Sequence, residues 1–201
     1  MEDIYKSYIN SFNLFNYRGF DTSSFKRISY NNFLDKFNFF SRNNNIIDIY
    51  VENQEKVCVI NFISSKSAKK LIERYNELIL LYNLTNKKYE IIIVIILKEI
   101  NNDDIRTICD EIDNLTIFNY KNIIVNIMEH SYVPIHIKLN DSEKLKLKDE
   151  LKLKSYDKLP YINKYDPVSK ILGLNYGDIC LIKRKCINSG ENNYYRYCCR
   201  E

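Results

Sequence analysis

The segment from Leu159 to Asp178 constrains the fold more than any other part of the chain, because it holds two of the three prolines and two of the four glycines. We expect Asp166 to cap a helix, since its carboxylate can accept a hydrogen bond from an unpaired backbone N–H of the first turn. Pro167 follows at the first helical position, where a missing N–H is harmless. Gly173 is predicted to end the helix, because glycine readily adopts the left-handed conformation found there.

The residues inside and after this helix complete the pattern. Val168, Ile171 and Leu172 are predicted to share one apolar face of the helix. The sequence Asn175-Tyr176-Gly177-Asp178 then indicates a turn that leads into a strand. The segment is therefore predicted to hold one rigid backbone shape.

Short motifs of fixed spacing extend this pattern through the last third of the chain. They are Leu159-Pro160, Asp166-Pro167-Val168, Leu172-Gly173-Leu174 and Gly177-Asp178, preceded by His130, Val133-Pro134, His136 and Leu139 and followed by Gly190 and Tyr194–Tyr197. Their order and spacing resemble the fifth subunit shared by eukaryotic RNA polymerases I, II and III, and the archaeal RNA polymerase subunit of the same family is similar over the same region. The alternative is a capped helix before a hairpin in an unrelated domain.

The charge of the chain is mild and unevenly spread. The formal net charge is +4. Residues 1–129 carry 16 basic and 17 acidic side chains, whereas residues 130–201 carry 14 basic and 9 acidic ones. Non-specific nucleic-acid binders have stronger basic patches, so we interpret this bias as a solvated surface.

The cysteines and the apolar runs exclude several classes of protein. None of the six cysteines forms a C-x-x-C pair, so no zinc site is predicted. The polar N-terminus does not resemble a signal peptide, and we expect reduced thiols in an intracellular protein. The longest apolar run, Ile91 to Leu97, is too short to cross a bilayer, so no membrane partner is expected.

The first 129 residues are predicted to form one α/β domain in the order α-α-β-β-α-β-α-β. The apolar periodicity indicates helices over 3–16, 31–40 and 68–82, with a further helix capped by Asp103 or Asp104 that turns Ile105, Ile108, Ile112 and Leu115 inward. Strands are expected over 46–51, 57–63, 89–97 and 122–128.

Residues 130–201 are predicted to form a second, small α+β module. We place the domain junction after Glu129, because Pro134 favours extended backbone before it. Strands are expected over 135–139, 179–185 and 194–199. The stretch from Asp141 to Lys154 alternates like a strand, yet Asn140 and Glu143 resemble a capping box, and we predict a helix.

No catalytic constellation, metal site or cofactor site is predicted. His130 and His136 are the only histidines, and no further ligand is evident beside them, so we interpret both as structural residues at the junction. The glycines occur in no phosphate-binding loop. In the polymerase family the first domain is similar to a restriction-nuclease-like core. Here Asp48 could supply one metal ligand, but the next strand offers no carboxylate or lysine, so no active nuclease is expected.

The resemblance implies a non-catalytic subunit of a DNA-directed RNA polymerase. It implies that the C-terminal module docks on the largest subunit and that the N-terminal domain is a jaw near downstream duplex DNA. Within the module we expect Ile171, Leu172, Leu174 and Tyr176 as apolar contacts to the partner and Arg184 and Arg196 as polar rim contacts. The expected structural signature is His130, Pro134, His136, Pro160, Asp166, Pro167, Gly173, Gly177 and Asp178.

The sequence departs from the family at one loop. Where relatives have Thr-Pro-Ser-Ala, this chain has Asn102-Asp103-Asp104-Ile105. Two carboxylates would repel a phosphate backbone, so contact with DNA at this loop stays open, with Lys98 and Arg106 as other candidates.

Two other functions and two compartments stay open as well. The alternatives are a stand-alone regulator that binds polymerase and a nuclease relic. The chain is rich in Asn, Ile, Lys and Tyr, whose codons are AT-rich, and this composition fits either a cell or a large DNA virus. A cellular protein of this kind is expected in the nucleus, and a viral one in the cytoplasmic factory and the virion.

Overall fold

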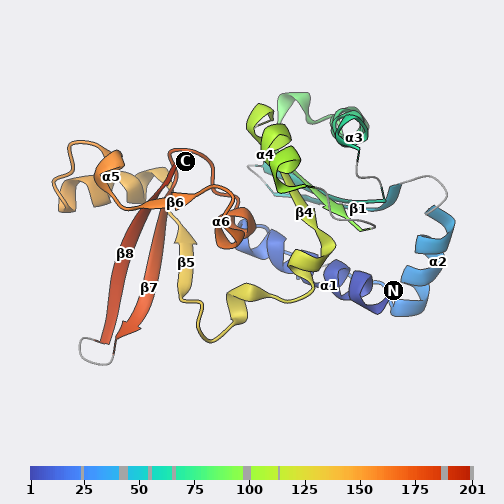
Figure 1. The fold of residues 1–201 in the computed structure, drawn as a ribbon, viewed down its shortest axis with the longest axis horizontal. Helices are drawn as coiled ribbons and strands as arrows, with labels where there is room; N and C mark the ends of the chain where they lie inside the picture. The colour runs from blue at the N-terminus through green and yellow to red at the C-terminus, as the bar shows by residue number, and fades with distance from the viewer. Residues whose placement is uncertain are drawn as a thin grey trace. The chain divides into compact units, whose positions relative to one another are not determined.

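The computed structural model describes residues 1–23, 25–40, 45–53, 56–64, 67–96, 101–112, 114–186 and 190–199. The chain divides into two compact units, Met1–Val125 and Asn126–Glu201 (Figure 1). The junction expected after Glu129 lies at the end of a short 3₁₀ turn, Ile127–Glu129, near the start of the second unit. None of the described helices is long and apolar enough to span a membrane.

The first unit is a four-stranded mixed sheet with helices, which confirms the predicted α/β class. Its strands lie in the order β1-β2-β3-β4; β1 and β2 are antiparallel, and the other two pairs are parallel. The elements are α1 (Glu2–Tyr17), α2 (Tyr30–Phe40), β1 (Asn45–Glu52), β2 (Lys56–Ile63), α3 (Ala68–Leu81), β3 (Lys88–Ile95), α4 (Asn102–Glu111) and β4 (Leu115–Asn119).

The core of this unit surrounds the two central strands. From Val57 to Ile63 every residue of β2 is buried, and so is the second half of β3, as expected for strands covered on both faces. In Figure 1, α3 and α4 lie on one side of the sheet and α1 on the other. Leu71, Tyr75 and Leu78 form the buried stripe of α3, while Tyr8 of α1 contacts Phe62 of β2, with ring centroids 6.1 Å apart.

The last strand of the first unit lies earlier than the sequence pattern predicts. Residues 120–129 contain the 3₁₀ turns Tyr120–Ile123 and Ile127–Glu129, so the strand expected over 122–128 is wrong. The side-chain amide of Asn10 donates to the carbonyls of Ile123 (3.0 Å) and Ile124 (2.6 Å), which satisfies backbone groups that a sheet would otherwise use. The true strand, β4, begins at Leu115, which helical spacing had assigned to the preceding helix.

The start of α4 also differs from the expectation. Its N-cap is Asn101, whose side chain accepts a hydrogen bond from the backbone N–H of Asp103, whereas Asp103 and Asp104 lie in the first turn. Their charges still favour the helix, because its N-terminus carries a partial positive charge.

The second unit contains a separate sheet with the strand order β5-β7-β8-β6. β7 is antiparallel to both neighbours, and β6 is parallel to β8. The elements are β5 (Ile135–Lys138), α5 (Asp141–Glu150), β6 (Tyr161–Asn163), α6 (Pro167–Leu172), β7 (Ile179–Cys186) and β8 (Gly190–Cys199). Sequence reasoning missed β6, which is only three residues long.

A capping box decides the ambiguous segment after β5 in favour of a helix. Asn140 Oδ1 accepts from the backbone N–H of Glu143 (2.9 Å), and Glu143 Oε2 accepts from that of Asn140 (2.8 Å). Leu147 of α5 packs against the sheet in a hydrophobic cluster of the second unit. The cluster contains Leu139, Leu147, Leu159 and Ile179, with Leu153, Tyr156, Leu181, Tyr195 and Tyr197 packed around it.

Candidate functional site

The short helix α6 is held at both ends by the residues that the sequence singles out. Asp166 Oδ1 accepts hydrogen bonds from the backbone N–H groups of Val168 (2.9 Å) and Ser169 (3.4 Å). Gly173 ends the helix in the left-handed region, at φ 63° and ψ 44°. The N–H of Leu174 then bonds back to the carbonyl of Ser169 at 2.9 Å, which closes the C-terminal cap. The predicted caps are confirmed.

The turn after α6 is fixed by its own aspartate and by a neighbouring strand. Asp178 Oδ2 accepts from the backbone N–H of Asn175 at 2.8 Å, and the carbonyl of Asn175 accepts from that of Asp178 at 3.0 Å. Gly177 has a φ of 88°, which glycine adopts without strain. Backbone hydrogen bonds from Gly177 to Cys198 (3.0 Å) and from Cys198 to Asp178 (2.8 Å) attach the turn to β8.

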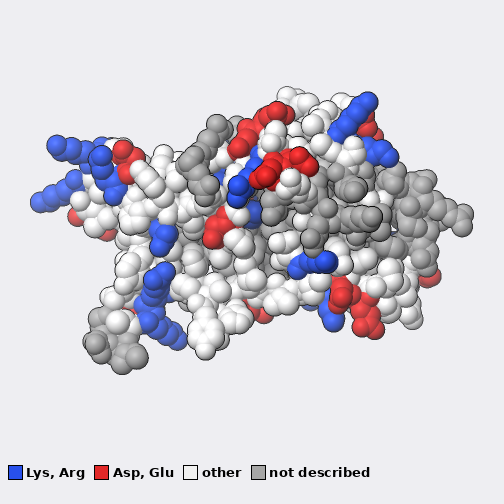
Figure 2. All heavy atoms as spheres, in the orientation of Figure 1, with Lys and Arg blue, Asp and Glu red and all other residues white. Residues whose placement is uncertain are grey.

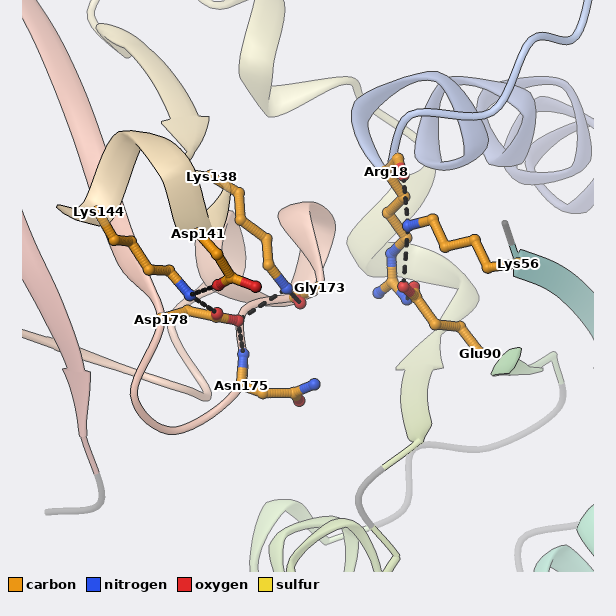
Figure 3. A network of polar contacts seen from close by, with 9 residues as sticks. All are labelled: Arg18, Lys56, Glu90, Lys138, Asp141, Lys144, Gly173, Asn175 and Asp178. Atoms are coloured by element: carbon orange, nitrogen blue, oxygen red, sulfur yellow. Dashed lines mark hydrogen bonds and ion pairs between the residues drawn. The ribbon is translucent and has the colours of Figure 1, made fainter. Parts of the chain in front are cut away.

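The Asp178 carboxylate joins this turn to three other parts of the unit (Figure 3). Lys138 Nζ of β5 lies 2.7 Å from Asp178 Oδ2, and Lys144 Nζ of α5 lies 2.9 Å from Oδ1. Lys138 Nζ also donates to the carbonyl of Gly173 at 2.9 Å, at the end of α6. One carboxylate thereby connects β5, α5, α6 and the turn into a rigid group, which we call the Asp178 clamp.

The ionisation of the clamp follows from its surroundings. Burial by itself would raise the pKa of Asp178, but Lys138, Lys144 and the N–H of Asn175 outweigh it, and the pKa is lowered. Burial would likewise lower the pKa of Lys144, but the hydrogen bond and charge of Asp178 outweigh it, and that pKa is raised. Both groups are therefore held in their charged forms at neutral pH.

Most of the expected partner contacts are buried side chains. Ile171, Leu172 and Leu174 are only 4, 4 and 2% exposed, so a partner cannot reach their side chains in this conformation. Tyr176 is half-buried beneath Lys164, whose Nζ lies 4.6 Å from the ring centroid.

The two arginines lie where the sequence reasoning expects surface residues. Arg184 is exposed, with its guanidinium carbon 5.3 Å from the ring centroid of Tyr194. Arg196 is half-buried and donates from Nη1 to the carbonyl of Tyr161 at 2.8 Å. On the face drawn in Figure 2, basic side chains gather over α5 and over the β7–β8 hairpin.

The histidines and the remaining prolines make structural contacts. His136 Nδ1 lies 2.7 Å from the carbonyl of Pro134, and burial lowers the pKa of His136. His130 Nδ1 accepts from the backbone N–H of Tyr132 at 3.3 Å. The carbonyl of Pro160 accepts from Tyr197 at 2.9 Å. Within the described ranges, no cluster of three or more His, Cys, Asp or Glu side chains could hold a metal ion.

The first unit has a clamp of its own, which sequence reasoning missed. Arg18, at the end of α1, pairs with Glu90 of β3 at 2.8 Å (Figure 3). Its guanidinium also donates to Thr116 of β4 at 3.2 Å. Lys56 contacts both Glu90 (3.2 Å) and the carbonyl of Arg18 (2.7 Å). Burial opposes the ionisation of Glu90, but the two cations outweigh it and lower the pKa of that carboxyl. The signal was Glu90, the one acidic residue of β3, directly before a run of apolar residues.

Asp48, the candidate nuclease ligand, is occupied by protein groups. Its Oδ2 lies 2.7 Å from Arg74 Nη2, and its Oδ1 accepts from the side-chain amide of Asn61. Asn61 stands opposite Asp48 on β2, where a metal site would need a second acidic residue. The buried guanidinium of Arg74 therefore supplies the positive charge that a metal ion would otherwise bring to Asp48.

Comparison with known proteins finds similarity in the second unit. The family described as RNA polymerase Rpb5, C-terminal domain, matches residues 125–198. DNA-directed RNA polymerase subunit Rpo5 of Sulfolobus acidocaldarius is 42% identical over 73 residues, which cover 36% of this chain and 86% of the archaeal one. The Pyrococcus abyssi subunit Rpo5 is 42% identical over 71 residues, covering 35% and 85%.

A eukaryotic relative matches a smaller share of its own length. The Dictyostelium discoideum subunit rpabc1 of DNA-directed RNA polymerases I, II and III is 40% identical over 81 residues. These residues cover 40% of this chain and 41% of the relative. The matched segments, of 81 and 73 residues, are about the size of the second unit, and the match spans less than half the length of the eukaryotic relative.

Proposed function

Since this chain belongs to the family of RNA polymerase subunits that includes archaeal Rpo5 and the Rpb5 C-terminal domain, we propose that it is a non-catalytic subunit of a multisubunit DNA-directed RNA polymerase. The resemblance drawn from the sequence motifs is confirmed at the level of the family. Two observations carry the proposal: the family match over residues 125–198, and matches of 73 and 71 residues that cover 86% and 85% of two archaeal subunits.

The second unit is proposed to dock on the largest polymerase subunit. In the archaeal relatives a stretch of this size makes up most of a polymerase subunit, which supports the second unit as the part that assembles. The Asp178 clamp supports the same role, because a surface whose backbone is already ordered loses little conformational entropy on binding. In this proposal the buried Ile171, Leu172 and Leu174 keep that surface in shape, and Arg184 and Arg196 lie at its rim.

The first unit is proposed to be a jaw with a restriction-nuclease-like core that has no catalytic metal. The support is the mixed sheet with its β1–β2 hairpin, and the ion pair between Asp48 of β1 and Arg74 of α3. Asp103 and Asp104 in the first turn of α4 argue against a phosphate contact there. Contact with downstream duplex DNA is therefore proposed for groups other than these two carboxylates. Arg106 of α4 is one candidate, although it pairs with Asp103 at 3.9 Å; Lys98 lies outside the described residues.

The compartment follows from the polymerase that the chain serves. A cellular polymerase would place it in the nucleus, and a polymerase of a large DNA virus in the cytoplasmic factory and the virion. A stand-alone regulator would differ from a polymerase subunit in its stoichiometry, because it would be recovered with polymerase at less than one copy per complex.

The docking proposal is tested with Gly173→Val in the full-length, tagged chain. A β-branched residue is strongly disfavoured at φ 63°, so we expect the variant to be recovered without polymerase. Gly173→Asn is the matched control, because asparagine tolerates the left-handed region, and it is expected to retain polymerase. Equal recovery of polymerase by the valine variant would contradict the proposal.

A further inference from the structure

The hairpin formed by β7 and β8 continues past the other strands of its sheet. The last pair between β5 and β7 joins Ile135 to Lys183, and β6 pairs with β8 only near the C-terminal end of β8. Beyond Lys183, among the described residues, each strand of the hairpin pairs only with the other. Figure 1 shows the far ends of these two strands extending beyond β5. We call residues 183–186 and 190–194 the hairpin arm.

The arm is basic and has no aliphatic side chain. Lys183, Arg184 and Lys185 follow one another in β7, and Glu191 is the one acidic residue of the arm, so its net charge is 3 − 1 = +2. Lys183 Nζ lies 3.7 Å from Glu191 Oε1, but these side chains are 36 and 51% exposed, and such pairs are weak in water. Within the described ranges, Arg184 and Lys185 have no acidic partner.

The other basic region of the unit, around α5, differs from the arm because its charges are balanced. From Asp141 to Lys158 the chain holds six lysines and five acidic residues, so 18 residues carry a net charge of 6 − 5 = +1. Lys144 of this region is bound by Asp178 at 2.9 Å. The nine residues of the arm carry +2, and on the face drawn in Figure 2 basic side chains lie over the hairpin. Positive charge is therefore denser in the arm than around α5.

Both faces of the arm present cations. Side chains alternate along a strand, so Arg184 shares one face with Tyr194. Lys183 and Lys185 lie on the other face, where Lys183 stands opposite the exposed Asn193. The guanidinium carbon of Arg184 is 5.3 Å from the ring centroid of Tyr194, which is 47% exposed. This stacking restricts the arginine side chain and leaves the N–H groups in the guanidinium plane available to a ligand.

These groups match a ligand whose negative charges repeat along an extended chain. Lysine, arginine, asparagine and tyrosine side chains supply many of the hydrogen bonds that proteins make to nucleic-acid phosphates. The centre of a protein–protein interface is instead depleted in lysine. A two-stranded β-ribbon is also narrow enough to enter the major groove of B-form DNA. The shape and the charge of the arm therefore favour a polynucleotide over a protein partner.

We infer that the hairpin arm is a nucleic-acid-binding site, in which Lys183, Arg184 and Lys185 contact the phosphate backbone without reading its sequence. Duplex DNA, single-stranded DNA and RNA share this phosphate chemistry, and the experiment below distinguishes them. The site goes beyond the proposed docking of the second unit. Arg184 serves both roles, because residues at the rim of an interface stay accessible to solvent. Binding is measured without polymerase, so its failure would leave the proposed function standing.

The site is tested by fluorescence anisotropy of the purified, full-length chain with labelled duplex DNA, single-stranded DNA and RNA of equal length, at rising salt. The arm variant combines Lys183→Gln, Arg184→Gln and Lys185→Gln. The control variant removes the same charge from exposed lysines in and after α5, and it combines Lys146→Gln, Lys152→Gln and Lys154→Gln. Circular dichroism checks that both variants are folded.

We expect the wild-type chain to bind all three probes with a Kd of roughly 10⁻⁴–10⁻⁶ M near physiological salt. The arm variant should lose about tenfold or more in affinity for each probe, and the control variant less than about threefold. For duplex DNA, the slope of log K against log salt should become shallower by roughly 2–3, since each phosphate contact contributes about 0.9. The probe that the wild type binds most tightly identifies the source of the phosphates.

A single exposed position provides a second test. Lys185→Glu should weaken binding of the duplex by about threefold or more, whereas Lys185→Arg keeps the charge and should bind like the wild type. Equal losses of affinity in the arm and control variants, or no binding by the wild type, would overturn the inference. Tighter binding of labelled polyglutamate than of every nucleic-acid probe would also overturn it, because the arm would then suit an acidic protein segment.

Discussion

Asp178→Asn is the substitution that tests the physical account of the second unit most sharply. It removes one negative charge and leaves the size of the side chain almost unchanged. The carboxylate is 13% exposed and has three partners within 2.9 Å: two ammonium groups and one backbone N–H. The amide of asparagine can still accept from Asn175, but its NH₂ group would face one of the two lysines.

The loss of stability expected for Asp178→Asn lies between two limits. Breaking a fully buried ion pair by removing one partner destabilises a protein by about 3–5 kcal/mol. A fully exposed pair contributes roughly 0–1 kcal/mol. Lys144 is 16% exposed and Lys138 is 35% exposed, so we expect the free energy of unfolding of the second unit to fall by about 2–3 kcal/mol. For a unit of this size that corresponds to a decrease in Tm of roughly 10–20 °C.

The pH dependence provides an independent check. The folded-state pKa of Asp178 lies below its ordinary value of 3.8. Its contribution to stability is therefore complete above the unfolded-state pKa and is lost as the pH falls through the lower folded-state pKa. The difference in unfolding free energy between wild type and Asp178→Asn should be constant near neutral pH and should shrink below about pH 4.

The assay is urea unfolding of both proteins at several pH values, followed by circular dichroism. Asp157→Asn is the matched control, because Asp157 pairs with Lys158 at 3.8 Å with both side chains exposed, and it should change stability by less than about 0.5 kcal/mol. A double-mutant cycle with Lys144→Met should give a coupling energy of about 1 kcal/mol or more. The reasoning would be refuted if Asp178→Asn lowered the free energy of unfolding no more than Asp157→Asn does, or if its effect stayed unchanged in acid.

Two further substitutions test other parts of the fold. Lys152→Gly should stabilise the chain by about 0.5–1 kcal/mol, because Lys152 follows the C-cap of α5 at φ 49°, where glycine has no steric penalty. Thermal unfolding measures this change, and destabilisation would contradict the prediction. Arg18→Gln should destabilise the first unit by about 2–4 kcal/mol, because Glu90 would keep only Lys56 as a cationic partner. Urea unfolding measures this loss, with Lys69→Gln at an exposed ion pair as the control. An equal loss of stability in both variants would contradict the prediction.

The elements with strong local signals could be predicted from the sequence. The stripe of Leu71, Tyr75 and Leu78 gave α3, and Asp166, Pro167 and Gly173 gave α6, because caps and apolar periods act over a few residues. The end of the first unit could not be predicted in this way. Asn10 lies far away in the sequence from the carbonyls of Ile123 and Ile124 that it satisfies, and a single sequence does not display such a contact.

The candidate site shows the same division. The residues that give α6 and its turn their shape could be named, since their backbone roles are local. Which side chains face outward could not, because Ile171, Leu172 and Leu174 look the same in the sequence whether they meet a partner or the unit's own core. The pairing of Leu139 with Ile179, which extends the β5–β7 ladder, likewise joins residues far apart in the sequence and is seen only in the folded chain.

The central claim, that this chain is a stoichiometric polymerase subunit, is tested most directly by purifying the tagged chain from its native cell and quantifying the proteins that remain bound. The account predicts the two largest polymerase subunits at one copy each per tagged chain, and their source identifies the cellular or viral enzyme. Recovery of the chain alone, or with only traces of polymerase, would contradict it.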